Sequence, residues 1–535
     1  METLAMLNIF ALERHIVSQM QAHQVPGLAL ALVEGEEILY ARGFGVTSVE
    51  DGGVPVTPQT LFRVGSITKP MTGTLIMRLV EMGKLELDAL AKKYVPNLAF
   101  SDARAVEKIT LRMLLSHTAG LPTSHEPFGR RDPTGLRDYI REQMPRYEMI
   151  APPGKVYSYS NPGIRLLGYI AEVVCGKPYT QLMQEYIFDP LEMRYSTFDP
   201  TVAMTYALAH SHDLNDDGTL SVQHRFGDNA AGYPSGSVIS NVTDLTHFAM
   251  MLIQEGRFGN RRIISTESIR QMQTIHGDMM TVSRAGYGLT LSLDHAQGLR
   301  LVGHQGAVGT YGSVLTVLPD VKRAVIMTCN RAFGFWDTLY AIGDRVIAEW
   351  LGLSTMQPAP AIIHPEKSLW SGYTGQYVGQ LRGLVNVSAE DGGLMLEWHG
   401  EKTQLEAHRP NVYFAKLGGE IVSIGFVPEA TDPTQYIMLN GAPCRRIDYM
   451  LPIVKDLDLW QKFTGVYVGV DKLKVTLRDD LLHVYSDEMA AEYACVALSD
   501  MAFACKMGLV EFETAADGSV TVLRLQGAYH LKRRV

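Results

Sequence analysis

The stretch that decides the fold is Phe62-Arg-Val-Gly-Ser-Ile-Thr-Lys-Pro70. Ser66 follows a glycine and opens a predicted helix over residues 66–82, with Lys69 three positions later. Residues i and i+3 share one face of a helix, so the lysine amine can reach the serine hydroxyl. Serine needs an adjacent base to act as a nucleophile, and a helix N-terminus offers N–H groups to an oxyanion. Taken alone, a serine N-cap followed by a lysine occurs by chance in many helices, so this stretch makes Ser66 and Lys69 a candidate pair whose function depends on the segments that follow.

Two later segments carry polar side chains at close spacing. Tyr159 and Asn161 stand just before a predicted helix, where a loop can aim a phenol and a carboxamide into one pocket. His304 and Gly306 follow a short predicted strand. The small glycine lets a substrate lie against the strand edge, with a backbone N–H free to donate. Both segments are candidate walls of the site around Ser66.

In this order and spacing, Ser66-x-x-Lys69, Tyr159-x-Asn161 and His304-x-Gly306 resemble the three motifs of the serine β-lactamase and penicillin-binding protein superfamily. The version is the class C β-lactamase-like one, and the resemblance covers about residues 10–350. Residues 114–122, 159–179 and 234–252 fit the same family. His304 stands where typical β-lactamases have a lysine, which argues against antibiotic hydrolysis. With the two C-terminal barrels expected below, the layout resembles bacterial D-aminopeptidases.

The resemblance implies a role for each motif residue. Ser66 would be the acylated nucleophile. Lys69 and Tyr159 would share the work of general base, and either could start deprotonated; Tyr159 would also activate the deacylating water. Asn161 would orient Lys69 and the acyl side of the substrate.

His304 and two backbone amides complete the expected site. His304 would hold Tyr159 or polarise the substrate, and the backbone N–H groups of Ser66 and Ala307 would form the oxyanion hole. An unperturbed histidine has a pKa near 6.5, so activity is expected to rise through that region. The resemblance implies no cofactor and no metal.

The chain has 535 residues, too many for one core, and its first 355 are predicted to form one α/β domain. Strands at both ends enclose a mainly helical insertion, so both ends complete one sheet. The predicted helices cover residues 4–22, 66–82, 111–115, 163–174, 179–186, 245–255 and 336–351. The predicted strands cover residues 27–33, 37–45, 287–293, 299–303, 313–318 and 323–329.

An internal repeat follows a proline-rich linker at residues 357–365. The stretch 370–379 recurs at 460–469, and each copy is followed by short alternating strands. Such units are typical of small antiparallel barrels, predicted here at residues 366–451 and 456–535 with a boundary near Pro452. The repeat aromatics are predicted core residues: Trp370, Tyr377, Trp460 and Tyr467. The basic strand ends are predicted surface charge: Arg445, Arg446, Lys532, Arg533 and Arg534.

Other motifs are better explained by structure than by ligands. Residues 213–218 copy the opening of a calcium loop, but His224 replaces the required glutamate, so a turn is expected. His210 and His212 lack a third zinc ligand at a recognised spacing. His117 is expected to be a structural, hydrogen-bonded histidine away from the nucleophile.

Composition limits the partners and the compartment. The net charge of −9 and pI near 6.0 give no field that attracts nucleic acid or anionic membrane. Five scattered cysteines make no disulfide framework, and the N-terminus lacks the pattern of a signal peptide. A cytoplasmic protein without a membrane span is expected, and a homo-oligomer stays open.

The sequence thus predicts a cofactor-free serine hydrolase that cleaves a small amide, short peptide or ester, first of all in the manner of a D-aminopeptidase. A carboxylesterase of the β-lactamase-like class and an acyltransferase use the same residues and remain alternatives. A β-lactamase-like binding protein without turnover is the alternative from another class, and intact Ser66, Lys69 and Tyr159 argue against it.

Overall fold

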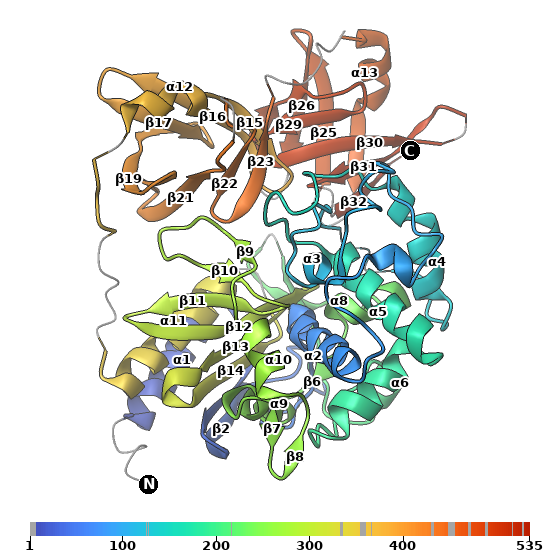
Figure 1. The fold of residues 1–535 in the computed structure, drawn as a ribbon, viewed down its shortest axis with the longest axis vertical. Coiled ribbons are helices and arrows are strands. Elements are labelled where there is room, and N and C mark those ends of the chain that lie inside the picture. The colour runs from blue at the N-terminus through green and yellow to red at the C-terminus, as the bar shows by residue number, and fades with distance from the viewer. Residues whose placement is uncertain are drawn as a thin grey trace.

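A computed structural model describes residues 7–534 except 125, 127, 216, 332–334, 354–359, 365, 430–432, 448–454, 469–471, 487–490, 516 and 527–528. A mixed α/β part is followed by two antiparallel barrels (Figure 1), which confirms the predicted fold class. Much of the expected linker and the boundary at Pro452 lie outside the described residues. None of the described helices is long and apolar enough to cross a membrane.

One eight-stranded antiparallel sheet organises the α/β part, in the order β2-β1-β14-β13-β12-β11-β10-β9. The strand β1 pairs along its length with β14, so the two ends of this part complete one sheet as predicted. The strands are β1 (Gly27–Glu34), β2 (Glu37–Gly45), β9 (Gly277–Asp278), β10 (Gly286–Tyr287), β11 (Ser292–Ala296), β12 (Leu299–Val308), β13 (Tyr311–Leu318) and β14 (Arg323–Cys329).

Helices cover both faces of this sheet because β1 is apolar on both sides. Leu28, Leu30 and Leu32 face α1 (Ile9–Ala22) and α11 (Phe335–Leu351). The alternate residues Ala29, Ala31 and Val33 belong to the larger core that contains α2 (Thr68–Glu81) and α9 (Val242–Ile253). A strand buried on both faces reads as a continuous apolar run, as β1 does.

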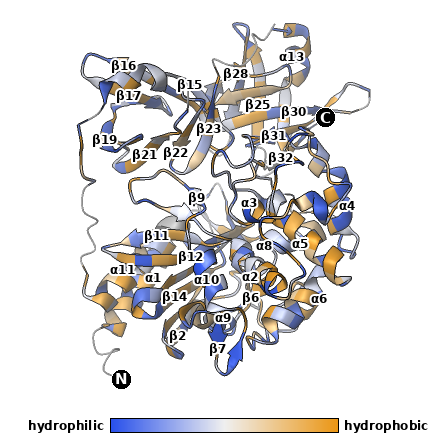
Figure 2. Cartoon of the chain, in the orientation of Figure 1, coloured by the Kyte–Doolittle hydropathy of each residue, from blue (hydrophilic) through white to orange (hydrophobic). Residues whose placement is uncertain are grey.

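The insertion between the sheet halves is mainly helical and holds α2. Its other helices are α3 (Leu111–Leu115), α4 (Gly135–Glu142), α5 (Asn161–Cys175), α6 (Tyr179–Met183), α7 (Pro200–Ala203), α8 (Tyr233–Gly236) and α10 (Thr266–Met272). The insertion also contains pairs of short strands: β3 (Phe62–Arg63) with β6 (Ile239–Ser240), β4 (His212–Leu214) with β5 (Leu220–Val222), and β7 (Arg257–Phe258) with β8 (Arg261–Arg262). In Figure 2 the apolar helices α5 and α11 contrast with the hydrophilic β7–β8 hairpin.

Several predicted elements differ from the observed ones. The strand expected over 299–303 continues as β12 to Val308, so His304 and Gly306 lie within the strand and not after it. The expected strand over 287–293 is interrupted between β10 and β11, where Thr290 has a positive φ of 64° that no extended strand allows. The N-terminal helix begins at Ile9, where Asn8 accepts a hydrogen bond from Ala11 N and caps the first turn. Its expected start at residue 4 lies outside the described residues.

The repeat folds as two nine-stranded sheets of the same strand order. The first runs β18-β17-β16-β15-β23-β22-β21-β20-β19, and the second runs β27-β26-β25-β24-β32-β31-β30-β29-β28. The first barrel has α12 (Trp370–Tyr373), β15 (Gly375–Gly379), β16 (Gly383–Glu390), β17 (Gly393–Trp398), β18 (Glu401–Gln404), β19 (Glu406–Arg409), β20 (Val412–Leu417), β21 (Glu420–Phe426), β22 (Tyr436–Leu439) and β23 (Ala442–Arg446). The second has α13 (Leu457–Phe463), β24 (Gly465–Val468), β25 (Lys472–Arg478), β26 (Leu481–Ser486), β27 (Ala491–Ala494), β28 (Val496–Ala497), β29 (Ala502–Cys505), β30 (Gly508–Thr514), β31 (Val520–Leu525) and β32 (Tyr529–Arg533).

The repeat aromatics hold the start of each barrel to its first helix. The buried hydroxyl of Tyr377 donates to Tyr373 O at 2.7 Å, and that of Tyr467 donates to Phe463 O at 2.7 Å. Three of the predicted core aromatics are fully buried, while Trp370 packs at the edge of its core.

The prediction that the basic strand ends are surface charge is wrong for Arg446. Its side chain is buried and donates to the carbonyls of Gly372, Thr374 and Thr434, which closes the end of α12. Arg533 donates to Thr464 O at 2.6 Å in the second barrel, so the two arginines have equivalent roles. Helix-end carbonyls lack intrahelical partners, which is why a cation is useful there.

The first barrel is fixed to the α/β part near the end of β15. The Gln380 amide donates to Thr123 O at 2.9 Å and accepts from Thr123 N at 3.1 Å. An ion pair joins Lys155 Nζ to Glu429 Oε2 at 2.9 Å, and Val282 N donates to Ser423 Oγ. These contacts hold the barrel over the loop that precedes residue 124.

We predict that Gln380→Ala loosens this junction, because it removes both hydrogen bonds to Thr123, each worth about 1 kcal/mol. Hydrogen exchange at residues 121–124 should become faster in the folded protein. Gln376→Ala, an exposed position on the same strand, is the matched control and should leave exchange unchanged. Unchanged protection of Thr123 in Gln380→Ala would contradict this account of the junction.

Candidate active site

Ser66 lies where the turn that begins α2 meets the strand β12. Gly65 has φ +52°, and a Cβ at this position would lie 2.6 Å from Ala307 N. A Cβ on Gly306 would lie 2.0 Å from Val64 O and 3.0 Å from Ser66 N. Only glycine fits at either position, and the close approach brings the backbone nitrogens of Ser66 and Ala307 to the same junction.

Lys69 is completely buried one turn along the same helix. Its Nζ lies 2.8 Å from Ser66 Oγ and donates to Ser235 O at 2.6 Å. Its pKa is held well below the usual lysine value by burial and, second, by the charge of Arg165. A lysine in this setting favours the neutral amine, which has a lone pair free to accept a proton.

Tyr159 approaches Ser66 from the other side of the hydroxyl. Its OH lies 2.8 Å from Ser66 Oγ, and its ring lies 4.7 Å from Lys69 Nζ. Burial raises the pKa of Tyr159 well above its usual value, so the side chain stays a phenol. The serine oxygen thus has a neutral amine and a neutral phenol within hydrogen-bond distance.

His117 packs on the face of Tyr159, which differs from its expected place away from the nucleophile. The two ring centroids are 4.6 Å apart, and His117 Nδ1 accepts from Ser160 N. The histidine is hydrogen-bonded and structural, as predicted, but it supports the phenol that contacts Ser66. Its φ of 56° makes the turn that brings it there.

Asn161 and His304 lie near Ser66 with partners other than the expected ones. Asn161 Nδ2 donates to Ser124 O at 2.9 Å, and the carbonyl of Ser235 contacts Lys69 in its place. His304 Nε2 lies 2.8 Å from the Tyr287 hydroxyl, whereas its ring centroid lies 6.2 Å from that of Tyr159. His304 therefore holds Tyr287 and does not hold Tyr159.

The expectation that His304 titrates near pH 6.5 is also wrong. Burial and the nearby Lys69 lower the pKa of His304 to about 3. The imidazole is therefore neutral throughout the neutral pH range, and another group must account for any change of activity near pH 6.5.

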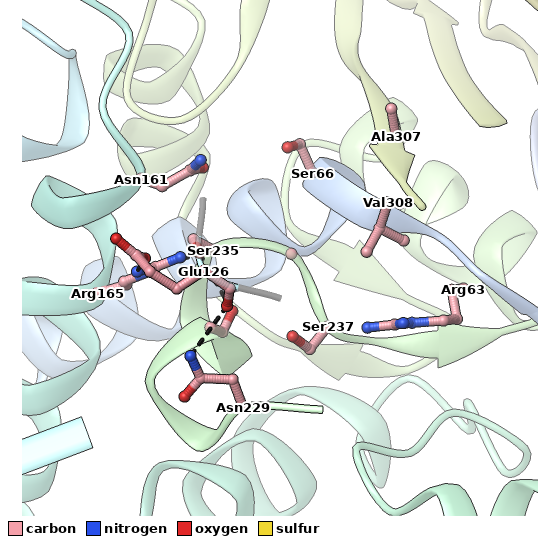
Figure 3. Close-up of a pocket in the computed structure, with 12 residues that line it drawn as sticks. Arg63, Ser66, Glu126, Asn161, Arg165, Asn229, Ser235, Ser237, Ala307 and Val308 are labelled. Atoms are coloured by element: carbon pink, nitrogen blue, oxygen red, sulfur yellow. Dashed lines mark hydrogen bonds and ion pairs between the residues drawn. The ribbon is translucent and has the colours of Figure 1, made fainter. Parts of the chain in front are cut away.

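A pocket opens beside Ser66 and contains about 430 Å³ of empty space, counted to its open mouth. Figure 3 shows Ser66 and Ala307 at one edge, Asn161 and Arg165 at another, and Arg63 on the opposite side. The remaining lining residues include Glu126, Asn229, Ser235, Ser237 and Val308. We call this the first pocket.

A second pocket lies on the Tyr159 side of the serine, with about 340 Å³ of empty space. The α/β part supplies Thr123, Ile150 and Tyr157–Tyr159, and the first barrel supplies Gln380, Leu381 and Gly441–Pro443. Behind it, Val427, Tyr436 and Met438 of the barrel pack against Tyr157 and Tyr287. The barrel therefore forms one wall of the space next to the phenol.

Several residues at the site belong to no sequence motif that would mark them as functional. Ser235 contributes a carbonyl that any residue could provide, although it lies within the family-like stretch 234–252. Arg165 is fully buried on α5 and forms an ion pair with Glu126. Its spacing from Asn161, one turn along the helix, is the only signal that could have placed it at the site.

The motifs set aside as turns have structural roles. Asp213 and Leu214 end β4, and the described residues that follow turn back toward β5, with Gly218 N donating to Asn215 O at 2.9 Å, which confirms a turn. His212 accepts from Val49 N at 3.1 Å and lies against Asn330 O. In the described part of the chain, no three metal-ligating side chains come together.

Comparison with known proteins agrees with this geometry. The family model described as Beta-lactamase matches residues 12–345, which hold the sheet, the helical insertion and Ser66. The chain belongs to the beta-lactamase family. The match ends before the barrels, which begin near residue 370.

Three relatives are similar to the beta-lactamase-like domain. Penicillin-binding protein 4 of Amycolatopsis lactamdurans is 30% identical over 59% of this chain and 84% of its own length. Protein flp of Staphylococcus aureus (strain MW2) is 26% identical over 59% of this chain and 61% of its own. Unguisins hydrolase ungD' of Aspergillus campestris is 27% identical over 58% of this chain and 59% of its own. The match thus spans about three fifths of the last two relatives.

Solved structures extend the likeness beyond the beta-lactamase-like domain. The octameric penicillin-binding protein homologue from Pyrococcus abyssi superposes with a TM-score of 0.58 at 25% identity, over 82% of this chain and all of that one. SurE superposes with a TM-score of 0.63 at 25% identity, over 82% of this chain and 98% of that one. A coverage of 82% includes residues beyond 345, so these proteins share part of the C-terminal arrangement.

We predict that His304→Gln leaves the pH dependence of activity between pH 5 and 8 unchanged, because His304 stays neutral across that range. The same variant should be less sensitive to acid unfolding. Between about pH 6.5 and 3 the unfolded histidine binds a proton that the folded one does not, so His304 destabilises the fold as pH falls. Melting temperatures at pH 7 and pH 4.5 test this. If the activity of the wild type changes between pH 5 and 8 and His304→Gln loses that change, the prediction is contradicted.

Proposed function

We propose that the protein is a serine hydrolase that cleaves a small amide, peptide or ester through an acyl-enzyme on Ser66. The observation that carries this proposal is the position of Ser66 Oγ, 2.8 Å from both Lys69 Nζ and the Tyr159 hydroxyl. A serine between a base and an acid has what acyl transfer needs, and the steps use protein groups alone.

Neutral Lys69 is the proposed first base. Its two N–H groups and one lone pair allow it to donate to Ser235 O while accepting the Ser66 proton. The serine oxygen attacks the carbonyl carbon, and the backbone N–H groups of Ser66 and Ala307 stabilise the resulting oxyanion. Lys69 was expected to share this role equally with Tyr159; the opposite pKa shifts favour Lys69.

Tyr159 is the proposed acid for the leaving group. The phenol passes its proton to the leaving nitrogen or oxygen as the carbonyl–leaving-group bond breaks, and it regains a proton from Lys69. In deacylation the same groups run in reverse: water loses a proton to the Tyr159–Lys69 pair as its oxygen attacks the ester carbon. The bond from that carbon to Ser66 Oγ then breaks, and the pair returns the proton to Ser66 as the acid product leaves. The leaving group therefore faces the second pocket, and the acyl group faces the first pocket.

Amide or peptide cleavage of D-aminopeptidase type is the preferred activity. The relative named unguisins hydrolase supports hydrolysis, and the SurE structure determined with D-Leu supports a substrate that contains a D-amino acid. A carboxylesterase or an acyltransferase would use the same three residues. A homo-oligomer is consistent with the octameric homologue. A panel of D- and L-aminoacyl 4-nitroanilides and 4-nitrophenyl esters separates these activities.

We predict that Ser66→Ala abolishes turnover and covalent labelling by a neutral fluorophosphonate probe, because it removes the only oxygen that can form the acyl-enzyme. Lys69→Ala should lower the rate by about 100-fold or more through loss of the base. Intact mass reports the labelling. Ser240→Ala, a buried serine away from both pockets, is the control and should label normally. Labelling that persists in Ser66→Ala would disprove the nucleophile, and a wild type that neither labels nor turns over would favour the binding-protein alternative.

We also predict that Leu381→Trp discriminates between leaving groups, because Leu381 lines the second pocket from the barrel. The KM of substrates with bulky leaving groups should rise, and that of substrates with small ones should stay the same. Ile421→Trp places the same ring on an exposed strand position of the same barrel and serves as the control. Equal KM changes for both substrate sizes would mean that the barrel does not border the leaving group.

A further inference from the structure

Arg63 is a buried cation at the first pocket. It lies on β3, three residues before Ser66, and its side chain is 9% exposed. Among the residues that the structure describes, it forms no hydrogen bond and no ion pair, and its buried Nε has no partner. Buried charges are normally paired, so this one requires an explanation.

Burial lowers the pKa of Arg63, and its surroundings offset only part of this effect without occupying its donors. The guanidinium carbon lies 4.5 Å from the centroid of the Phe226 ring, a cation–π arrangement. Asp228 and the phenols of Tyr233 and Tyr311 are near enough to influence its charge. The Asp228 carboxylate, however, pairs with Arg131 Nε at 3.5 Å. The N–H groups at the pocket edge of Arg63 therefore remain available.

The other charges that line the first pocket cancel. Glu126 is ionised: burial alone would raise its pKa, but Arg165 and hydrogen bonds from Ser124 and Tyr147 lower it to about 2. Its carboxylate pairs with the buried Arg165 guanidinium. Arg63 remains as an uncompensated positive charge, and Figure 3 shows its guanidinium directed across the pocket toward Ser237.

We infer that Arg63 binds a carboxylate carried by the acyl part of the substrate. The inference rests on the proposed acyl-enzyme, which directs the acyl group into the first pocket. A guanidinium binds a carboxylate through two parallel N–H···O bonds, and a poorly solvated site strengthens such bonds. Ser237 offers a hydroxyl donor on the same side. At the far end of the acyl chain the enzyme therefore prefers a carboxylate over a neutral group or an ammonium at equal length; the preference does not concern the α-amino group of an aminoacyl substrate.

The test compares acyl groups of one length that differ only in charge. The 4-nitrophenyl monoesters of four- to eight-carbon dicarboxylic acids are the anionic series. The fatty-acid and ω-amino-acid esters of equal length are the neutral and cationic series. For at least one length, kcat/KM of the wild type should be about 10-fold or more higher for the anionic ester.

Variants assign the preference to Arg63. Arg63→Met should abolish the preference while labelling of Ser66 by the neutral fluorophosphonate continues. Arg63→Lys should retain part of it, because the charge persists but the planar pair of N–H groups does not. Arg137→Met removes an exposed cation that does not line the pocket and should leave the preference unchanged. If Arg63→Met does not fold, the comparison of the three ester series with the wild type and with Arg63→Lys still tests whether Arg63 causes the preference.

The outcomes separate this inference from the proposed function. A wild type that is labelled and active but treats the three series alike would overturn the inference alone. A preference that survives in Arg63→Met would do the same and would leave Arg63 a packing residue on Phe226. A wild type that neither labels nor hydrolyses any ester would overturn both.

Discussion

The contact between the turn that begins α2 and the strand β12 is the constraint on which the rest of the molecule depends. Gly65 and Gly306 allow the two backbones to approach more closely than any side chain would permit. That approach joins the helical insertion to the sheet and brings the amides of Ser66 and Ala307 together. Lys69 is buried as a consequence, since it lies one turn further along the same helix.

Burial of this junction also sets its electrostatics. Lys69 and His304 lose their usual tendency to be charged, and Tyr159 keeps its proton, because water is excluded from all three. The charges that do persist lie one layer further out, at Arg165, Glu126 and Arg63. The site thus combines neutral groups around Ser66 with charged side chains in the first pocket.

The two barrels arise from one sequence repeat and have the same fold, but they lie at different places in the molecule. Both copies have the same strand order and the same tyrosine bond to the first helix. The first copy bonds to Thr123 through Gln380 and packs on Tyr157 and Tyr287. The corresponding position of the second copy lies in residues 469–471, outside the described part. The first barrel is thus part of the surroundings of Tyr159.

The sequence by itself predicted the fold class and grouped Ser66, Lys69 and Tyr159, because the order and spacing of three motifs resemble those of a known family. It also predicted the two barrels, since an internal repeat can be recognised from the sequence alone. Only the tertiary structure decided the partners of Asn161 and His304, the low pKa of His304 and the burial of Arg446. Hydrogen-bond partners and burial depend on residues far apart in the chain, such as Tyr287 and Ser235, whose approach follows from packing and has no signal in local sequence.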